Sequence, residues 1–112
     1  PGEKASHGAA QLAAWQTMQK SHAIANGVFV VAVNRVGHEG PEGAGLEFWG
    51  HSFVCDPAGV VLAEAGAGEE TLVVELDLGR IEEQRRGWPF LRDRRIDAYA
   101  GLLRRFLDQG PR

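Results

Sequence analysis

A short apolar run constrains the fold of this chain more than any other feature. Residues 28–33 read Val-Phe-Val-Val-Ala-Val, with no polar residue among them. A continuous run of β-branched and aromatic residues is typical of a strand that is covered on both faces, and this one is far too short to span a bilayer. We therefore expect a strand in the middle of a sheet, and a layered fold rather than a membrane protein.

The residues before this strand predict a helix. Residues 8–26 are rich in alanine, glutamine and other good helix formers. Ser6 stands where an N-cap is expected, and Gly27 where a helix stops. Four residues fall near one face at helical spacing: Leu12, Trp15, Met18 and His22.

Three further strands are predicted after the first, over residues 48–55, 60–64 and 71–76. Residues 56–59 (Asp-Pro-Ala-Gly) link the first two, because proline presets one dihedral angle and glycine accepts a positive one, as a hairpin turn requires. Residues 37–45 are mostly glycine, proline and glutamate, which indicates a mobile surface loop.

The last third predicts two helices with an arginine-rich irregular segment between them. The first covers residues 80–86 and is broken by Gly87 and Pro89. The second covers residues 96–107, with four apolar residues on one side: Tyr99, Leu102, Leu103 and Phe106. The order of helices and strands predicts the α/β class and one small domain. Alone, these elements would leave sheet edges and one face uncovered.

Composition narrows the possible partners and location. The net charge is −3, and acidic residues interleave with the arginines of the last third without aromatic stacking residues, so nucleic-acid binding is not expected. The single cysteine permits no internal disulfide, which fits a reducing cytoplasm. The first residues carry neither a basic region nor an apolar stretch, so we expect no secretory signal.

Cys55 is the only thiol, and we expect it to be structural. A nucleophilic thiolate needs a neighbouring positive charge or a helix N-terminus. Cys55 instead ends a predicted strand and is followed by Asp56 and Pro57.

The four histidines, His7, His22, His38 and His51, show no metal-ligand spacing. We expect no metal site. His22 is expected to pack or hydrogen-bond on its helix, and His51 to point outward from its strand.

Four blocks of sequence resemble the nitrilase (carbon-nitrogen hydrolase) superfamily, and within it the bacterial N-carbamoylputrescine amidohydrolase branch. They are residues 15–37, ending in Asn-Arg-Val-Gly; residues 46–59, with an aromatic-x-Gly-x-Ser strand; residues 71–78; and the signature Trp-Pro-Phe-Leu-Arg-Asp-Arg-Arg-Ile-Asp-Ala-Tyr over residues 88–99. The resemblance implies an α-β-β-α sandwich. It also implies that residues 1–112 are the carboxy-terminal part of a single domain, to be completed by an upstream half or a companion chain.

The resemblance implies an activity as well: hydrolysis of N-carbamoylputrescine to putrescine, carbon dioxide and ammonia. In the family a cysteine attacks the carbonyl, a glutamate transfers protons and a lysine stabilises the oxyanion. All three lie upstream of the matched region, so none is assigned here, and the isolated chain is expected to be inactive. Neither a metal nor an organic cofactor is implied.

Supporting roles can be assigned by resemblance to residues of this chain. Five would support the substrate pocket, or act only as scaffold for the sheets: Asn34, Arg35, Phe48, Gly50 and Ser52. Five would lie at a homo-oligomer interface, although core packing explains the first equally well: Trp15, Met18, Arg92, Arg94 and Arg95.

Two alternative functions remain open from the sequence. The chain could belong to a different amide or nitrile hydrolase of the superfamily, because the residues that select the substrate lie largely elsewhere. It could also be a non-catalytic oligomerisation module. The two classes differ in whether an upstream region or second polypeptide supplies the cysteine, glutamate and lysine.

Overall fold

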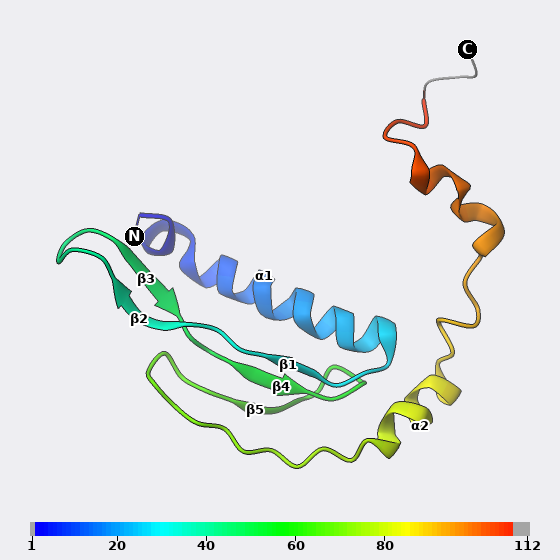
Figure 1. Ribbon diagram of the computed structural model, residues 1–112, viewed down its shortest axis with the longest axis horizontal. Helices are drawn as coiled ribbons and strands as arrows, with labels where there is room; N and C mark the ends of the chain where they lie inside the picture. The colour runs from blue at the N-terminus through cyan, green and yellow to red at the C-terminus, as the bar shows by residue number, and fades with distance from the viewer. Residues whose placement is uncertain (1, 109–112) are drawn as a thin grey trace.

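A long helix opens the described part of the chain. The computed structural model describes residues 2–108, and helix α1 spans Gly2–Asn26 (Figure 1). The helix begins before the predicted start at Gly8, so Ser6 lies inside it and the predicted N-cap is wrong. The preceding Glu-Lys-Ala sequence consists of good helix formers, which extend the helix past the serine.

The end of α1 is where the sequence predicts it. Gly27 has a φ of 60°, and its N–H donates to the carbonyl of Ile24 at 3.3 Å, while the N–H of Val28 donates to the carbonyl of Ala23 at 3.1 Å. These two bonds are the Schellman arrangement that satisfies the last carbonyls of a helix.

Four strands form one bent antiparallel hairpin. The pair Ala32–Phe53 lies on one side of the bend and the pair Val36–Trp49 on the other. Three residues separate these pairs on each strand, so the register continues across the bend without an insertion. The strands are β1 (Val30–Ala32), β2 (Val36–Glu39), β3 (Leu46–Trp49) and β4 (Phe53–Cys55).

The bend corrects two predictions. Residues 48–55 form the end of one strand and all of another, rather than a single strand. Residues 37–39 belong to β2, so the predicted loop is reduced to the turn over residues 40–45. The alternation of residues predicts pairing but not this change of direction.

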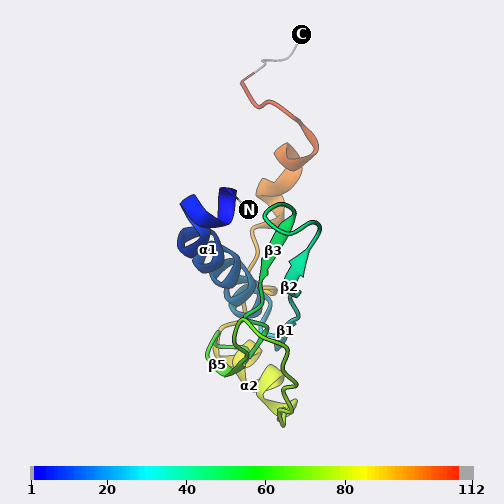
Figure 2. The ribbon, with the colours of Figure 1, turned by 90° about the vertical axis from the view of Figure 1, so that its left-hand side faces the viewer.

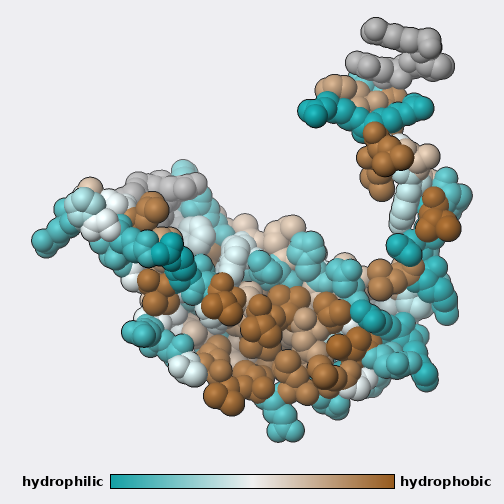
Figure 3. Space-filling view, viewed as in Figure 1, coloured by the Kyte–Doolittle hydropathy of each residue, from teal (hydrophilic) through white to brown (hydrophobic). Residues whose placement is uncertain are grey.

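Strand β5 (Val61–Glu64) pairs with β4, which gives the sheet order β1-β4-β5. In the part of the chain that the structure describes, β1 is therefore an edge strand, and its place in the middle of a larger sheet stays a prediction. Helix α1 covers one face only, and the side chains of Val31 and Val33 are 60% and 82% exposed. Apolar side chains gather over the strands on the face seen in Figure 3.

The core lies between α1 and the three-stranded sheet. Its buried members are Ala23, Ala32, Phe53 and Cys55. Trp15 contacts Phe53 edge to face, with ring centroids 5.6 Å apart and an interplanar angle of 88°, a favoured aromatic geometry. Trp15 therefore packs against this core, and its place at an oligomer interface stays a prediction.

The predicted turn over residues 56–59 is confirmed and has a buried carboxylate at its centre. Asp56 is 1% exposed. Its Oδ1 accepts the N–H groups of Ala58 and Val60, both at 2.9 Å, and its Oδ2 lies 3.0 Å from Nη2 of Arg80. A buried charge is tolerated when it is paired and hydrogen-bonded in this way.

The segment after β5 departs most from prediction. Residues 71–76, predicted as a strand, belong to no sheet among the described residues. Helix α2 (Gly79–Gly87) confirms the short helix. The last predicted helix is instead the 3-10 helix η1 (Ile96–Leu103), with its apolar side chains exposed. It projects from the body (Figures 1 and 2), and an amphipathic helix without a surface to pack on lacks its main source of stability.

The molecule is flat. Its radius of gyration is 19.1 Å and its extents are 55 × 46 × 18 Å, whereas a compact domain of roughly 100 residues has a radius of about 13 Å. The α/β class is confirmed, as one helix layer on one sheet layer. None of the helices in residues 2–108 has the length and apolar character needed to cross a membrane.

Substitution of Gly27 tests the junction between α1 and α2. A Cβ on Gly27 would lie 2.9 Å from Cγ of Arg85, and the left-handed backbone disfavours alanine by about 1–2 kcal/mol. We expect Gly27→Ala to lower the free energy of unfolding by at least that amount, measured by urea titration with tryptophan fluorescence. The matched control is Gly87→Ala, whose Cβ would contact nothing within 4 Å. Equal effects of the two substitutions would contradict the role of Gly27.

Candidate functional site

Polar side chains join the two strands where the hairpin bends. The N–H of Asn34 donates to Oγ of Ser52 at 2.8 Å, and the Ser52 hydroxyl lies 3.3 Å from the Asn34 carbonyl. Nδ2 of Asn34 donates to the carbonyl of Gly50 at 2.9 Å. These bonds take the place of the strand-to-strand backbone hydrogen bonds, which are interrupted at the bend. The backbone groups that they involve therefore remain paired.

The bend itself depends on two consecutive residues with left-handed backbone. Gly50 has a φ of 67° and His51 a φ of 57°. The N–H of Gly50 donates to the carbonyl of Arg35 at 2.9 Å, and the N–H of His51 donates to the carbonyl of Gly66 at 3.0 Å. Among the described residues His51 is the only non-glycine residue with positive φ. Such a residue costs about 1–3 kcal/mol and persists only where its surroundings hold it.

His51 is therefore not an outward-pointing strand residue, and that prediction is wrong. Its side chain is half-buried, and its backbone lies between β3 and β4. The sequence signal for this left-handed backbone was the position of His51 between Gly50 and Ser52. Histidine is among the residues that enter the left-handed region more often than others.

Arg35 and Phe48 complete the group at the bend. The Arg35 guanidinium lies 4.5 Å from the centroid of the Phe48 ring and forms an ion pair with Glu39. The Arg35 side chain is 63% exposed. The structure thus brings together all five residues predicted to support the pocket. The polar atoms of Asn34 and Ser52 are used within the chain, and substrate contact stays a prediction.

Trp49, also at this bend, carries an unsatisfied donor. Its Nε1 is buried, and no acceptor for it exists among the described residues. Buried polar atoms are hydrogen-bonded in most native structures. An acceptor outside residues 2–108 would satisfy this indole.

Cys55 has the surroundings of a structural residue. Its side chain is 0% exposed, burial raises the pKa of the thiol from its ordinary value of 9.0, and the Asp56 carboxylate raises the pKa further. A thiol in this state is protonated at neutral pH, which does not favour nucleophilic attack.

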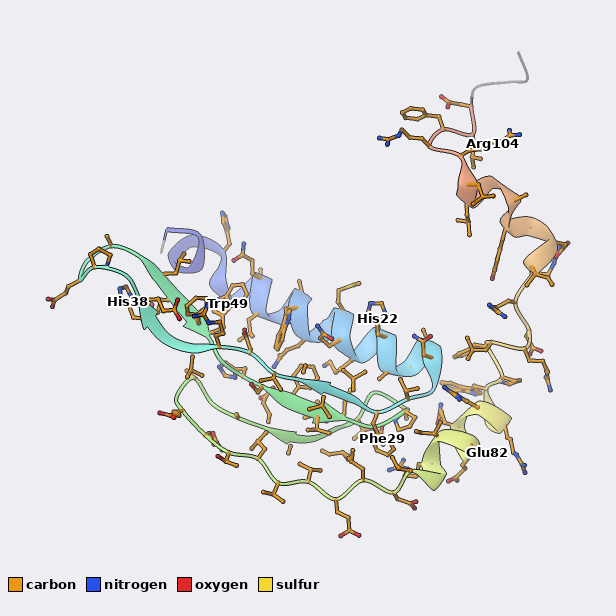
Figure 4. All side chains as sticks on the ribbon, viewed as in Figure 1. His22, Phe29, His38, Trp49, Glu82 and Arg104 are labelled. Atoms are coloured by element: carbon orange, nitrogen blue, oxygen red, sulfur yellow. The ribbon has the colours of Figure 1, made fainter. Side chains whose placement is uncertain are left out.

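The histidines form no cluster. Figure 4 shows His22 on α1 and His38 in the β2–β3 hairpin, and both side chains are exposed. The predicted packing of His22 is wrong, while His38 Nε2 lies 3.2 Å from the carbonyl of Pro41. No group of three potential metal ligands exists within the residues that the structure describes.

The arginines predicted at an interface pair locally in the described chain. Arg92 pairs with Asp93 at 2.9 Å, and Arg95 pairs with Asp97 at 2.7 Å. The hydrogen bond from Arg95 lowers the pKa of Asp97. Arg94 Nε donates to the carbonyl of Leu91 at 2.7 Å.

Met18 is exposed, as an interface residue would be in the isolated chain. A homo-oligomer interface through Trp15, Met18 and these arginines stays a prediction.

Two of the cavities that lie away from the bend border α1. One of about 190 Å³ separates the end of α1 from residues 88–92. The other, of about 570 Å³, is an open groove along α1, bordered by Gly59 and Phe90. The smaller cavity has no nucleophilic side chain in its lining, whereas Lys20 and Ser21 line the groove.

Comparison with known proteins places these features in a family. Residues 5–86 match the family model described as carbon-nitrogen hydrolase. The chain is 43% identical over 94 residues to the N-carbamoylputrescine amidase of Solanum tuberosum, covering 80% of this chain and 31% of the relative. It is 46% identical over 81 residues to an (R)-stereoselective amidase of a Pseudomonas species, covering 72% and 28%.

A crystal structure of a carbon-nitrogen hydrolase from Helicobacter pylori G27 superimposes with a TM-score of 0.80 at 54% identity. The match covers 87% of this chain and 34% of that chain. The chain thus spans about a third of the length of the curated relatives it matches.

Substitution at Gly50 tests the bend. A Cβ there would lie 2.7 Å from the Gly66 carbonyl oxygen, whereas a Cβ on Gly37, which also has positive φ, would contact nothing within 4 Å. Both substitutions to alanine carry the left-handed cost of about 1–2 kcal/mol, and only Gly50→Ala adds a backbone clash. We expect Gly50→Ala to lower the free energy of unfolding by about 1 kcal/mol or more beyond Gly37→Ala, measured in urea. A smaller loss for Gly50→Ala would show that the bend relaxes freely.

The raised pKa of Cys55 predicts a pH dependence of stability. Because the folded-state pKa exceeds the unfolded value, the stabilisation is complete below pH 9.0 and is lost as pH rises through the folded pKa. We expect the free energy of unfolding to fall above pH 9.0 in the native chain, and to fall less in Cys55→Ala. Parallel pH profiles for the two proteins would contradict the assignment.

Proposed function

The chain belongs to the carbon-nitrogen hydrolase family, and we propose that it is the carboxy-terminal part of an amidase that hydrolyses N-carbamoylputrescine. The observation that carries the proposal is the 43% identity over 94 residues to an N-carbamoylputrescine amidase. One water would convert the substrate to putrescine, carbon dioxide and ammonia. This activity would place the complete protein in polyamine biosynthesis, in the cytoplasm.

The catalytic cysteine, glutamate and lysine are proposed to lie upstream of this chain. Cys55, its only thiol, is buried, and burial raises its pKa. The flat shape and the unsatisfied Trp49 indole support a domain completed by further residues. The active site would form only when the upstream part covers the exposed apolar face of this sheet.

The residues at the bend are proposed to hold the wall of the pocket rather than to bind the substrate directly. The backbone N–H of Asn34 donates to the Ser52 hydroxyl, and the side-chain amide of Asn34 donates to the Gly50 carbonyl. N-carbamoylputrescine has a terminal ammonium, which an unpaired guanidinium would repel. The carboxylate of Glu39 beside Arg35 would reduce this repulsion, so the contact of Arg35 with Phe48 is compatible with this substrate.

Two other functions have support, and the experiments below distinguish them from this one. The 46% identity to an (R)-stereoselective amidase favours another amide substrate, since the remaining two thirds of the protein would select it. A non-catalytic oligomerisation module is favoured by the projecting apolar residues of η1. The proposed homo-oligomer would use the same tail together with Met18.

The decisive measurement is amide hydrolysis by the protein purified from its source, with the intact mass of each chain determined after denaturation. We expect a species larger than 12.1 kDa, or a companion chain, together with release of ammonia and putrescine from N-carbamoylputrescine. N-carbamoylbutylamine, which lacks the ammonium, is the matched control and should react more slowly. A lone 12.1 kDa chain without turnover would refute the amidase and favour the module.

Substitution of Cys55 tests whether the catalytic nucleophile is a different cysteine from the single thiol of this chain. We expect Cys55→Ala in the complete protein to retain turnover, because the thiol is buried away from solvent. Loss of turnover with an unchanged thermal midpoint would show that Cys55 is the nucleophile. Faster hydrolysis of an (R)-amide than of N-carbamoylputrescine would instead support the other amidase.

A further inference from the structure

We propose that Glu39 is a specificity-determining residue, whose carboxylate binds an ammonium group at the end of the substrate remote from the scissile amide. The substrates favoured by this residue are amides of alkylamines that carry a second, protonated amine. This inference deepens the proposed function and rests on it for the location of the pocket.

Glu39 lies on the face of the hairpin that α1 does not cover. On β1, Ala32 belongs to the core beneath α1 and is 7% exposed, whereas Val31 and Val33 are 60% and 82% exposed. Side chains of a strand alternate between its faces, and the register continues across the bend. Arg35 and Glu39 therefore continue the face of Val31 and Val33. Figure 1 shows β2 and β3 extending from β1 and β4 in this direction.

This outward face changes from apolar to charged at the bend. Val31 and Val33 are followed, at the same spacing of two, by Arg35, Gly37 and Glu39. Under the proposed function, the upstream part of the protein covers this face. Covering a charged pair with apolar surface is costly, because the ions lose their hydration. A polar ligand in a pocket beside Arg35 and Glu39 avoids this cost, so we expect the pocket where the apolar residues end.

Arg35 holds the Glu39 carboxylate in place. The Arg35 guanidinium lies 4.5 Å from the centroid of the Phe48 ring, and its Nη2 forms an ion pair with Oε1 of Glu39. Gly37, which pairs with Phe48 across the ladder, has no side chain to separate the two charged groups. A guanidinium stacked on an aromatic ring is restricted in its orientation. The carboxylate is therefore held although its side chain is 54% exposed.

The second oxygen of this carboxylate is open to a ligand. Arg35 contacts Oε1, and Oε2 of Glu39 has no partner within the part of the chain that the structure describes. An ionised carboxylate accepts several hydrogen bonds, and an alkylammonium donates three. An ammonium bound at Oε2 lies closer to the carboxylate than to the guanidinium, so attraction exceeds repulsion.

Glu39 would discriminate between substrates by the chemistry of their remote end. An ammonium forms a charge-assisted hydrogen bond with Oε2. A methyl group in the same place leaves the carboxylate partly dehydrated and without a donor. Sites built to hydrogen-bond a polar group reject analogues that lack it. Glu39 therefore favours N-carbamoylputrescine over an uncharged amide of the same length.

The selectivity of the complete protein tests this assignment. The measurement is the ratio of kcat/KM for N-carbamoylputrescine to kcat/KM for N-carbamoylbutylamine. We expect Glu39→Gln, which removes the charge and keeps the shape, to lower this ratio by about 10-fold or more. The loss should appear mainly as a higher KM for N-carbamoylputrescine, because Glu39 contacts the end of the substrate that does not react.

The matched control is Glu42→Gln, which removes an exposed charge from the turn between β2 and β3. This substitution should leave the ratio within about twofold, because exposed charges are screened by salt. An equal fall in the two variants would overturn the proposal by showing a general attraction of cations to the hairpin. A lower thermal midpoint of Glu39→Gln with an unchanged ratio would also overturn it, and would assign the ion pair to stability alone.

Binding of putrescine separates this inference from the proposed function. Putrescine is the amine product, and its amines are protonated at neutral pH. We expect calorimetric titration of the complete protein to show putrescine binding, with a Kd raised about 10-fold or more by Glu39→Gln. The neutral analogue 1,4-butanediol should not bind.

The two measurements together assign each failure to one proposal. Binding of putrescine that depends on Glu39, without amide hydrolysis, would refute the amidase alone. Hydrolysis with a selectivity that Glu39→Gln does not change would refute the role of Glu39 alone. Neither binding nor hydrolysis would refute both.

Discussion

The hydrogen bonding between Asn34 and Ser52 is the constraint on which the rest of the sheet depends. Gly50 and His51 adopt a left-handed backbone that a regular ladder cannot accommodate. An amide and a hydroxyl side chain bridge the gap, so the hairpin changes direction while its register stays the same. A slip of one residue would turn Phe53 and Cys55 away from α1 and abolish the core.

The core that this register creates is small and one-sided. A few buried residues between α1 and β4, with Trp15 against Phe53, account for the packing of the described chain. The opposite face presents Val31 and Val33 to solvent. Membership in the carbon-nitrogen hydrolase family gives this asymmetry a simple explanation, since the chain matches only about a third of its relatives' length.

Local chemistry was readable from the sequence, and long-range geometry was not. Gly27, the turn over residues 56–59 and α2 were predicted correctly, because glycine, proline and helix formers act on their nearest neighbours. The bend at Gly50 was missed because the alternation of apolar and polar residues indicates which face of a strand is buried, and carries no information on where the strand changes direction. The strand predicted over residues 71–76 has the right pattern but lacks a neighbour in residues 2–108. Of the candidate site, the resemblance identified five residues that do meet, while the backbone of His51 became visible only in three dimensions.

The ion pair between Asp56 and Arg80 ties together two positions that are distant in sequence. Replacing Arg80 alone leaves the buried Asp56 carboxylate without a counter-charge, and replacing Asp56 alone leaves the Arg80 guanidinium without its acceptor. Related sequences are therefore expected to change both positions together or neither. Such linked variation would record, in the history of the family, that the hairpin turn and α2 were selected as one unit.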